Sequence, residues 1–357
     1  MKYVINGKIF TKKRITGLLR YMIELLKVID KKIENIKEIE IEILIPEKTY
    51  NLPELKNIKY VVKGKLIDNI WEQITLYLYA KKTKRTIINM SNTAPILKPD
   101  ILIVHDINIT KNSSQFNFIK VLFYKILYSL NIKRAKKLIT VSNFSKEEIS
   151  KYYKIDKNKI IVVPNAWQHV NRIKEKTKTK ASTVLNYDIV QSNNNDKKEY
   201  FFTWGSIDKH KNIEWVYEVA KHNTNYNFYI SGLMINKKIM KNKELDKISN
   251  VKYLGYVPDE EIIDIIVNSK ALIAPSLYEG FGLTVIEALA LGTKIIISDI
   301  PVFREIYGNS AYYIDPYNPD INLDKLLDKN INSREDVLKK YDWERSGDIL
   351  LNEILKE

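Results

Sequence analysis

The sequence predicts two α/β domains in tandem, each built on a parallel sheet of Rossmann type. Short apolar runs alternate with longer helical patterns in both halves of the chain, and this alternation is typical of parallel βαβ units. Residues 171–198, rich in Lys, Thr, Ser and Asn, separate the two series and are expected to form a surface linker that ends in a loop. A length of 357 residues also exceeds what one hydrophobic core usually serves.

The first domain is expected to span residues 1–170. Its predicted strands are the apolar runs at residues 4–5, 41–45, 101–104 and 137–141. Helical patterns lie between them, at residues 17–29 and 147–153 among others. Strands separated by helices in this way pair in parallel, with their carboxyl ends at one edge of the sheet.

The second domain is expected to span residues 199–340 and to repeat the same design. Its predicted strands lie at residues 200–204, 227–230, 251–254, 271–274 and 294–297. Its predicted helices lie at residues 212–221, 259–268 and 283–291. Two such domains enclose a cleft, and ligands favour the carboxyl ends of the strands.

Composition narrows the class of protein. The chain contains no cysteine, so a disulfide framework, a thiolate metal site and a cysteine nucleophile are excluded. The sequence has neither an uncharged apolar run of membrane-spanning length nor a signal-peptide core, so we expect a cytoplasmic protein. Residues 1–170 hold 32 basic against 15 acidic residues, whereas residues 171–357 hold 26 against 28. The basic half suggests an anionic partner, and solvated lysine in a lysine-rich chain is the simpler alternative.

The segment at residues 116–130 is apolar on nearly all sides if it is a helix, and a basic run follows it at residues 133–137. One interpretation is a helix buried under the sheet. The other is a surface that contacts a membrane carrying a lipid-linked acceptor, at the inner face of the cell membrane. The basic first half makes the second interpretation reasonable.

The most informative segment follows the predicted strand at residues 271–274. It reads SLYEGFGL at residues 276–283, and a helix is expected to start at its end. Gly280 and Gly282 let the backbone come close to a ligand, because they carry no Cβ. The N–H groups at the start of the helix and its positive dipole end suit a phosphate.

Two carboxylates accompany this loop. Glu279 precedes the helix, and Glu287 lies about one turn inside it, so both can face one cleft. Such carboxylates accept hydrogen bonds from sugar and ribose hydroxyls, and one near an anomeric carbon stabilises oxocarbenium charge. The simpler alternative is a glycine turn before a helix, with both glutamates on the surface.

Glu279 and Glu287 are separated by seven residues, and the run around them resembles the signature of the family-4 glycosyltransferases, which have the GT-B fold. The resemblance is strongest over residues 201–316. Weaker matches lie at residues 6–7, 15–17, 104–106, 140–142 and 164–167. The resemblance implies a retaining glycosyltransferase that uses a nucleotide-diphospho-sugar. It also implies that the helix at about residues 341–357 returns to the first domain.

The resemblance assigns roles to these residues one by one. Glu279 would contact the donor sugar near its reacting face, and Glu287 would hold the ribose hydroxyls. Backbone N–H groups would contact sugar hydroxyls and phosphate at Phe281, Gly282, Leu283 and Thr284. Thr284 replaces the proline that is common in the family, and its backbone N–H stays available.

A leaving nucleoside diphosphate gains negative charge, so an enzyme without a metal needs fixed cations and N–H donors. The segment that starts at Gly205 lies where a strand turns into a helix and supplies Lys209, His210 and Lys211. The resemblance places Lys211 on the diphosphate, and His210 stands where the family often has an arginine. No Asp-x-Asp pair occurs in the chain, which favours a metal-independent reaction without a cofactor.

Further candidates depend on the resemblance. Gly17 opens a helix and would meet the donor phosphates. His105 follows the strand at residues 101–104 and would lie near the donor sugar and the acceptor, and Asp106 would orient its ring or contact the acceptor. Tyr256, after a strand of the second domain, would stack on the nucleotide base. A structural histidine and an ordinary tyrosine are the alternatives.

The sequence therefore predicts a glycosyltransferase that moves a sugar from a UDP- or GDP-sugar to a hydroxyl of a glycan or lipid-linked acceptor, in cell-surface polysaccharide or lipid-linked glycan assembly. A sugar-nucleotide epimerase or a phosphorolytic GT-B enzyme is a second hypothesis. A non-catalytic polyanion binder is a third, although the sequence carries no motif of nucleic-acid recognition and we expect no nucleic-acid partner.

Overall fold

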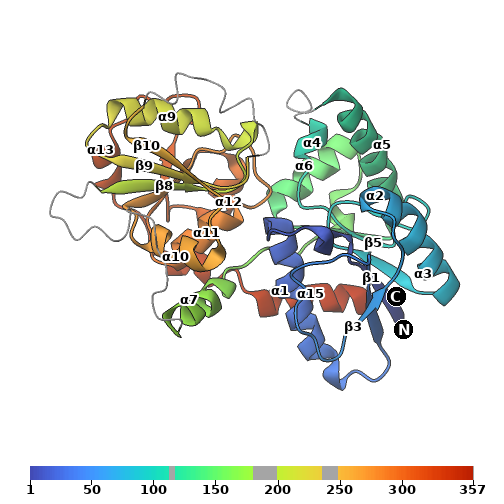
Figure 1. The fold of residues 1–357 in the computed structure, drawn as a ribbon. Helices are drawn as coiled ribbons and strands as arrows, with labels where there is room; N and C mark the ends of the chain where they lie inside the picture. Colours follow the sequence, from blue (N-terminus) through green and yellow to red (C-terminus); the bar gives the residue numbers. More distant parts are fainter. Residues whose placement is uncertain (112–116, 180–198, 235–247, 357) are drawn as a thin grey trace. The chain divides into compact units, whose positions relative to one another are not determined.

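The computed structural model describes residues 1–111, 117–179, 199–234 and 248–356. The chain forms two compact units, Met1–Asn165 together with Asp342–Glu357, and Ala166–Tyr341. Each unit has one parallel sheet covered by helices (Figure 1). The predicted fold class, two Rossmann-like parallel-sheet domains, is therefore confirmed.

In the described ranges, the first unit holds a seven-stranded sheet in the order β3-β2-β1-β4-β5-β6-β7. The strands are β1 (Lys2–Asn6), β2 (Glu40–Ile45), β3 (Lys59–Val62), β4 (Thr86–Asn89), β5 (Ile101–Ile103), β6 (Lys137–Thr140) and β7 (Ile160–Val162). All neighbours pair in parallel, and Ile5 lies between Ile43 and Ile88. Such β-branched runs suit strands that are buried on both faces.

One face of this sheet carries α1 (Gly17–Lys32) and α15 (Trp343–Leu355), which pack side by side (Figure 1). Thr16 caps α1, because its side chain accepts the N–H of Leu19 at 3.4 Å. Gly347 lets the two helices approach, since a Cβ there would stand 2.3 Å from Cγ1 of Val28. Short 3₁₀ turns complete this part of the chain at η1 (Lys8–Thr11), η2 (Ile33–Asn35) and η5 (Lys157–Lys159).

The remaining helices of this unit are α2 (Asp68–Trp71), the π-helical turn η3 (Glu72–Leu76), α3 (Tyr77–Thr83), α4 (Asn108–Lys111), α5 (Phe118–Arg134) and α6 (Asn143–Tyr153). Trp71, Leu76 and Ala80 pack with core residues of β1 and β2. Tyr128 and Ile132 of α5 pack with the next part of the core. The other side of α5 is exposed, so the interpretation of this helix as fully buried is wrong.

In the described ranges, the second unit holds a six-stranded sheet in the order β10-β9-β8-β11-β12-β13. The strands are β8 (Tyr200–Trp204), β9 (Asn227–Ser231), β10 (Val251–Gly255), β11 (Ala271–Ala274), β12 (Ile295–Ser298) and β13 (Tyr312–Ile314). The helices are α7 (His169–Thr179), η6 (Lys209–Lys211), α9 (Ile213–His222), α10 (Asp259–Val267), α11 (Leu283–Ala290), α12 (Pro301–Tyr307), α13 (Leu323–Leu327) and α14 (Glu335–Leu338).

The expected linker at residues 171–198 differs from the structure in its first part. Residues 171–179 belong to α7, which packs against α10, and residues 180–198 lie outside the described residues. The second unit also starts at Ala166, before the expected boundary at residue 170. The reason is that Trp167 donates its indole N–H to the carbonyl of Leu338 at 3.0 Å, which ties this segment to the second unit.

Both sheets reverse their strand order once, between β1 and β4 in the first unit and between β8 and β11 in the second. Ligands of open parallel sheets bind beside the carboxyl ends of the strands at such a switch point. A ligand site is therefore expected at these two places. Among the described helices, none is both long and apolar enough to span a bilayer.

Candidate active site

A small hollow lies at the switch point of the second sheet. β8 delivers Gly205 and Ser206 there, and β11 delivers Pro275 and Ser276. The hollow is lined mainly by the ends of these strands and the segments after them: Thr203, Trp204, Gly205, Ser206, Lys211, Pro275, Ser276, Glu279 and Thr284. The structure thus brings together Gly205, Lys211, Glu279 and Thr284, four of the residues singled out in the sequence.

Glu279 is held by two donors at this hollow. Its Oε1 accepts from the ammonium of Lys211 and from the hydroxyl of Ser276, the latter at 2.9 Å. The segments that carry these groups are joined directly, because the N–H of Leu277 donates to the carbonyl of His210 at 2.7 Å. Ser276 belongs to the motif at residues 276–283, but no role was predicted for it from the sequence.

The surroundings of Glu279 fix its charge. Burial alone would raise its pKa, but the positive charges of Lys211 and His210 and the hydrogen bonds from Lys211 and Ser276 outweigh it. The pKa of Glu279 is therefore below its ordinary value, and the side chain is a carboxylate at neutral pH. His210 acts here through its charge, and its Nδ1 lies 3.7 Å from a carboxylate oxygen of Asp208.

Gly282 sets the start of α11. It adopts φ +87°, and a Cβ there would lie 2.6 Å from Cε1 of Phe303, so glycine is required on both counts. No side chain caps this helix, and its first N–H groups, at Leu283 and Thr284, have no acceptor within the helix. Thr284 also lines the hollow. The helix start thus offers N–H donors and a positive dipole end beside the Lys211–Glu279 pair.

Glu287 is buried one turn further along α11. Its Oε1 lies 2.6 Å from Nε2 of His169 at the start of α7, and both side chains are almost fully buried. The alternative of a surface position for Glu287 is therefore wrong. His169 was not predicted from the sequence, although it follows closely the weaker match at residues 164–167.

Tyr307 is a buried tyrosine that contacts the glycine loop between the two glutamates. Its hydroxyl donates to the carbonyl of Gly282 at 3.0 Å, beneath the glycine loop. Burial raises the pKa of Tyr307 well above its ordinary value, and the charges of Tyr341, Glu279 and Glu287 raise it further. The charges of both carboxylates thus disfavour ionisation of this buried hydroxyl.

The strand ends beside the hollow approach one another very closely. A Cβ at Gly232 would lie 1.6 Å from the carbonyl oxygen of Gly205, so position 232 accepts no larger residue. Gly255 accepts hydrogen bonds from the N–H of Gly232 at 2.8 Å and the hydroxyl of Ser231 at 2.9 Å. Tyr256 follows at once and is 37% exposed.

In the first unit, His105 lies after β5 and is buried. Its Nε2 is 3.1 Å from the carbonyl oxygen of Met90, and its ring stands edge-on to Tyr21 at 4.6 Å between centroids. A carbonyl oxygen only accepts, so Nε2 carries the proton and Nδ1 carries the lone pair. Burial lowers the pKa of His105 to about 4, and the imidazole is neutral at physiological pH.

Asp106 and Gly17 have local roles in this unit. The carboxylate of Asp106 accepts the N–H of Asn108 at 2.9 Å, at the start of α4. The groups that orient the His105 ring are the Met90 carbonyl and Tyr21, so the suggestion that Asp106 orients it gains no support from these contacts. Gly17 is the first residue of α1 and is exposed.

The switch point of the first sheet holds a buried polar network that the sequence did not reveal. Glu72, fully buried in η3, accepts from the amide of Asn6 and the hydroxyl of Thr93, both at 2.8 Å. Lys8 pairs with Glu72 at 2.7 Å and donates to Thr93 at 2.7 Å. The network neutralises a buried carboxylate at the carboxyl end of β1, where Gly7 lets the chain turn.

Residues 187–341, which contain Lys211, Glu279 and Glu287, match the model of the protein family described as "Glycosyl transferases group 1". The match covers less than half of the chain. Together with the relatives described next, it shows that the chain is a glycosyltransferase, as the sequence predicted, and a hexosyl-transferring enzyme.

Relatives agree with this assignment. The O-antigen chain mannosyltransferase RfbU of Salmonella typhimurium is 29% identical over 265 residues, which cover 72% of this chain and 68% of RfbU. The O-antigen chain mannosyltransferase B of Escherichia coli is 36% identical over 70 residues, but these cover only 20% of this chain and 18% of that protein.

Solved structures agree on the fold. HepE of Anabaena, crystallised in complex with UDP and glucose, superposes with a TM-score of 0.69 at 12% identity, with 100% of both chains covered. The lipopolysaccharide glycosyltransferase WaaG superposes with a TM-score of 0.64 at 11% identity, with 97% of this chain and 94% of WaaG covered. The glycosyltransferase therefore has the GT-B fold.

The described residues of this glycosyltransferase bring no three His, Asp or Glu side chains together in a way that would hold a metal ion. The charged groups that the hollow presents to a ligand are the ammonium of Lys211 and the carboxylate of Glu279.

Proposed function

We propose that this glycosyltransferase moves a hexose from a nucleotide-diphospho-sugar to an acceptor hydroxyl, keeps the anomeric configuration, and needs no metal ion or other cofactor. The Lys211–Glu279 pair carries the proposal, because it stands beside the N–H groups of α11 at the switch point of the second sheet. One cation, one carboxylate and a helix start are what a diphosphate attached to a sugar requires.

The leaving diphosphate would be bound first. On donor binding, Lys211 exchanges part of its contact with Glu279 for a phosphate oxygen, and the N–H groups of Leu283 and Thr284 bind the same diphosphate. As the bond between the anomeric carbon and the phosphate oxygen breaks, both electrons of that bond go to the diphosphate. These fixed donors then stabilise the growing charge, without a metal.

The ionised Glu279 would face the sugar. Its carboxylate accepts hydrogen bonds from sugar hydroxyls and stabilises positive charge on the ring as the anomeric bond breaks. The acceptor oxygen attacks from the face that the diphosphate leaves, and its proton goes to a phosphate oxygen. This route retains configuration and needs no covalent intermediate on Glu279.

Other predicted contacts complete the proposal. Glu287, oriented by His169, would hold the ribose hydroxyls, and Tyr256 would stack on the base. His105 would act as a neutral group near the sugar and the acceptor, with Nδ1 as its acceptor atom, since Nε2 is engaged by Met90. Gly17 would meet the donor phosphates, and Asp106 would contact the acceptor. His210 would bind the diphosphate.

The O-antigen mannosyltransferases among the relatives make mannose the first sugar to test and GDP-mannose the first donor. We expect the acceptor to be a growing surface polysaccharide or a lipid-linked glycan. The reaction would then take place in the cytoplasm, at the inner face of the cell membrane, with the basic first unit in contact with the lipid.

The test is release of nucleoside diphosphate from a panel of GDP-, UDP-, dTDP- and ADP-sugars in the presence of EDTA, by the full chain and by Glu279→Gln. The proposal expects one donor to turn over in EDTA and Glu279→Gln to lose about 100-fold or more. Activity that needs an added divalent ion would contradict metal independence.

The same reactions separate the alternatives. An epimerase would return an altered sugar nucleotide without free diphosphate, and a phosphorolytic enzyme would need inorganic phosphate. Proton NMR of the glycoside formed decides the stereochemistry: an anomeric configuration opposite to that of the donor would exclude retention.

A further inference from the structure

The first unit exposes two rows of large apolar side chains. Ile67, Ile70, Ile74 and Leu78 recur every three or four residues along α2, η3 and α3, so they line one side of that helical segment, and each is 47–68% exposed. Helix α5 shows Phe118, Ile119, Leu122, Phe123 and Ile126, each 45–77% exposed. Within the described residues, these two rows hold nine of the 19 exposed large apolar side chains.

The two helical segments that carry these rows are anchored to the same loop. The carbonyl of Ala94 accepts from the side chain of Gln73 in η3 at 2.9 Å and from that of Asn131 in α5 at 3.1 Å. The loop that starts at Ala94 thus fastens both helices, and Leu97 at its tip is 71% exposed. Apolar surface of this extent on a soluble unit marks a place of interaction.

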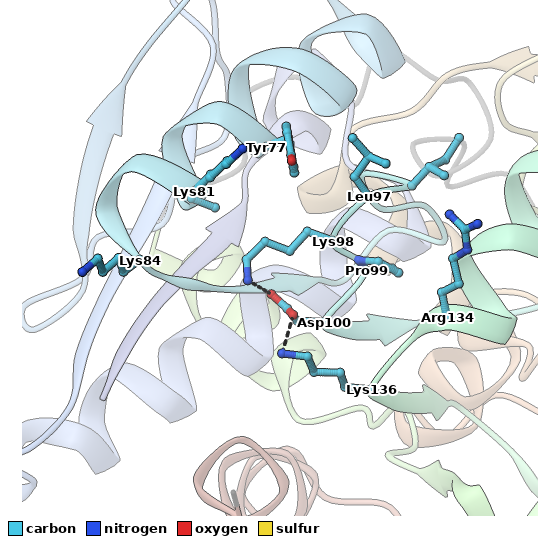
Figure 2. A pocket seen from close by; sticks show the side chains of 11 residues that line it. Tyr77, Lys81, Lys84, Leu97, Lys98, Pro99, Asp100, Arg134 and Lys136 are labelled. Carbon is cyan, nitrogen blue, oxygen red and sulfur yellow. Dashed lines mark ion pairs between the residues drawn. The ribbon is translucent and has the colours of Figure 1, made fainter.

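The same loop borders a basic hollow of about 600 Å³ between the ends of α3 and α5 (Figure 2). Its charged lining comprises Lys81, Lys84, Lys98, Arg134, Lys136 and Asp100. Lys98 and Lys136 each pair with the buried Asp100 at 3.0 Å. Figure 2 shows both side chains pointing toward Asp100. Within the described residues, Lys84 and Arg134 pair with no carboxylate, so the hollow carries excess positive charge.

We propose that this face, formed by the apolar rows of α2–α3 and α5, docks on an anionic lipid bilayer, and that the basic hollow receives a lipid phosphate. The positive charge of this face favours an anionic lipid, and not a protein of ordinary composition, as its partner. Residues 62–136 contain 13 basic and four acidic residues, and Lys120 and Lys125 lie within the apolar row of α5. Apolar side chains among lysines are the composition of surfaces that enter the headgroup region of anionic membranes.

This inference extends the proposed function, which expects a lipid-linked acceptor, by stating which residues meet the lipid. Cosedimentation of the full chain with vesicles tests it, using phosphatidylcholine alone and phosphatidylcholine mixed with phosphatidylglycerol. We expect binding to the mixed vesicles that weakens with added salt. The variant Phe118→Ser/Leu122→Ser/Phe123→Ser should lose on the order of tenfold or more of this binding, because the deleted side chains carry the inserted area.

Matched variants test whether vesicle binding depends on this face of the first unit. Tyr317→Ser/Val267→Ser removes exposed apolar side chains from the second unit and should bind vesicles as the wild type does. Lys84→Gln/Arg134→Gln should weaken binding to the anionic vesicles and flatten its salt dependence, whereas Lys325→Gln/Lys329→Gln on the second unit should not. Thermal unfolding and nucleoside diphosphate release with a water-soluble acceptor should match the wild type in all four variants.

Several results would overturn the proposal. One is a wild-type protein that binds neither kind of vesicle, and another is an α5 variant that binds as well as the wild type. A third is self-association in sedimentation velocity that the α5 variant abolishes, because a second copy would then cover this face. The donor assay of the proposed function is independent of these results, so the two proposals can fail separately.

Discussion

Lys211 and Glu279 form an ion pair at the switch point of the second sheet although they stand 68 positions apart in the sequence. The pair has a consequence for the pH dependence of catalysis. The pKa of Glu279 lies below its ordinary value of 4.5, so the carboxylate stays charged until the pH falls below that value. Lys211→Met removes a charge that lowers this pKa and leaves the burial that raises it.

We therefore expect Lys211→Met to lower kcat by about 100-fold, through lost stabilisation of the leaving diphosphate. The acidic limb of its pH–rate profile should also move to higher pH, because Glu279 then takes up a proton more readily. Lys209→Met is the control and should keep the wild-type profile. An unmoved acidic limb in Lys211→Met would show that Glu279 does not govern that limb.

The contact between His169 and Glu287 leads to a second prediction, which concerns donor binding. It lies 2.6 Å from Glu287, and both groups are buried, so replacing the imidazole leaves a buried carboxylate without this partner. We expect His169→Leu to raise the KM for the donor on the order of tenfold, with a smaller change in kcat. Glu287→Gln should raise it similarly, and the double variant should be no worse than the more affected single variant. The exposed His222→Gln serves as control, and additive effects would separate His169 from Glu287.

These contacts show how much of the site can be predicted from the sequence. Glu279, Gly282 and Glu287 lie within nine residues, and their spacing on a loop and one helical turn is readable from local rules. His169 is not readable in that way, because its partner stands 118 positions away and only the path of the chain brings them together. The buried network around Glu72 was hidden for the same reason.

The same distinction applies to the fold: local sequence patterns predicted its elements, but not which of their faces are buried. Apolar runs such as residues 101–104 and 271–274 predicted strands because each is short, apolar and bounded by turns. The start of α7 was not predicted, since residues 171–179 are polar and carry few apolar positions. In α5 the apolar pattern predicted a helix correctly, but it could not tell which side faces the core. Burial depends on what the fold places opposite each face.

The close approach of Gly205 and Gly232 predicts a stability difference within the second unit. In Gly232→Ala, the new Cβ would lie 1.6 Å from a backbone oxygen at a φ of +151°, so β8 and β9 must separate. We expect a loss of about 3 kcal/mol or more in the free energy of unfolding. Gly255→Ala is the matched control, since it has φ +72° and open space around the Cβ, and should lose about 1 kcal/mol. Urea unfolding measures both, and equal losses would contradict the predicted clash.

His105 predicts how stability varies with pH. Burial lowers its pKa to about 4, whereas in the unfolded chain it titrates near its ordinary value of 6.5. Between these values the unfolded state binds a proton that the folded state does not, so the free energy of unfolding should fall as the pH falls from 6.5 to 4. The contribution of this one group is about 3 kcal/mol at most.

In His105→Gln, whose amide can still donate to the Met90 carbonyl, this part of the pH dependence should disappear. His222→Gln, at an exposed position, should follow the wild type. If wild type and His105→Gln kept a constant difference in unfolding free energy over this range, His105 would not be held neutral by the fold.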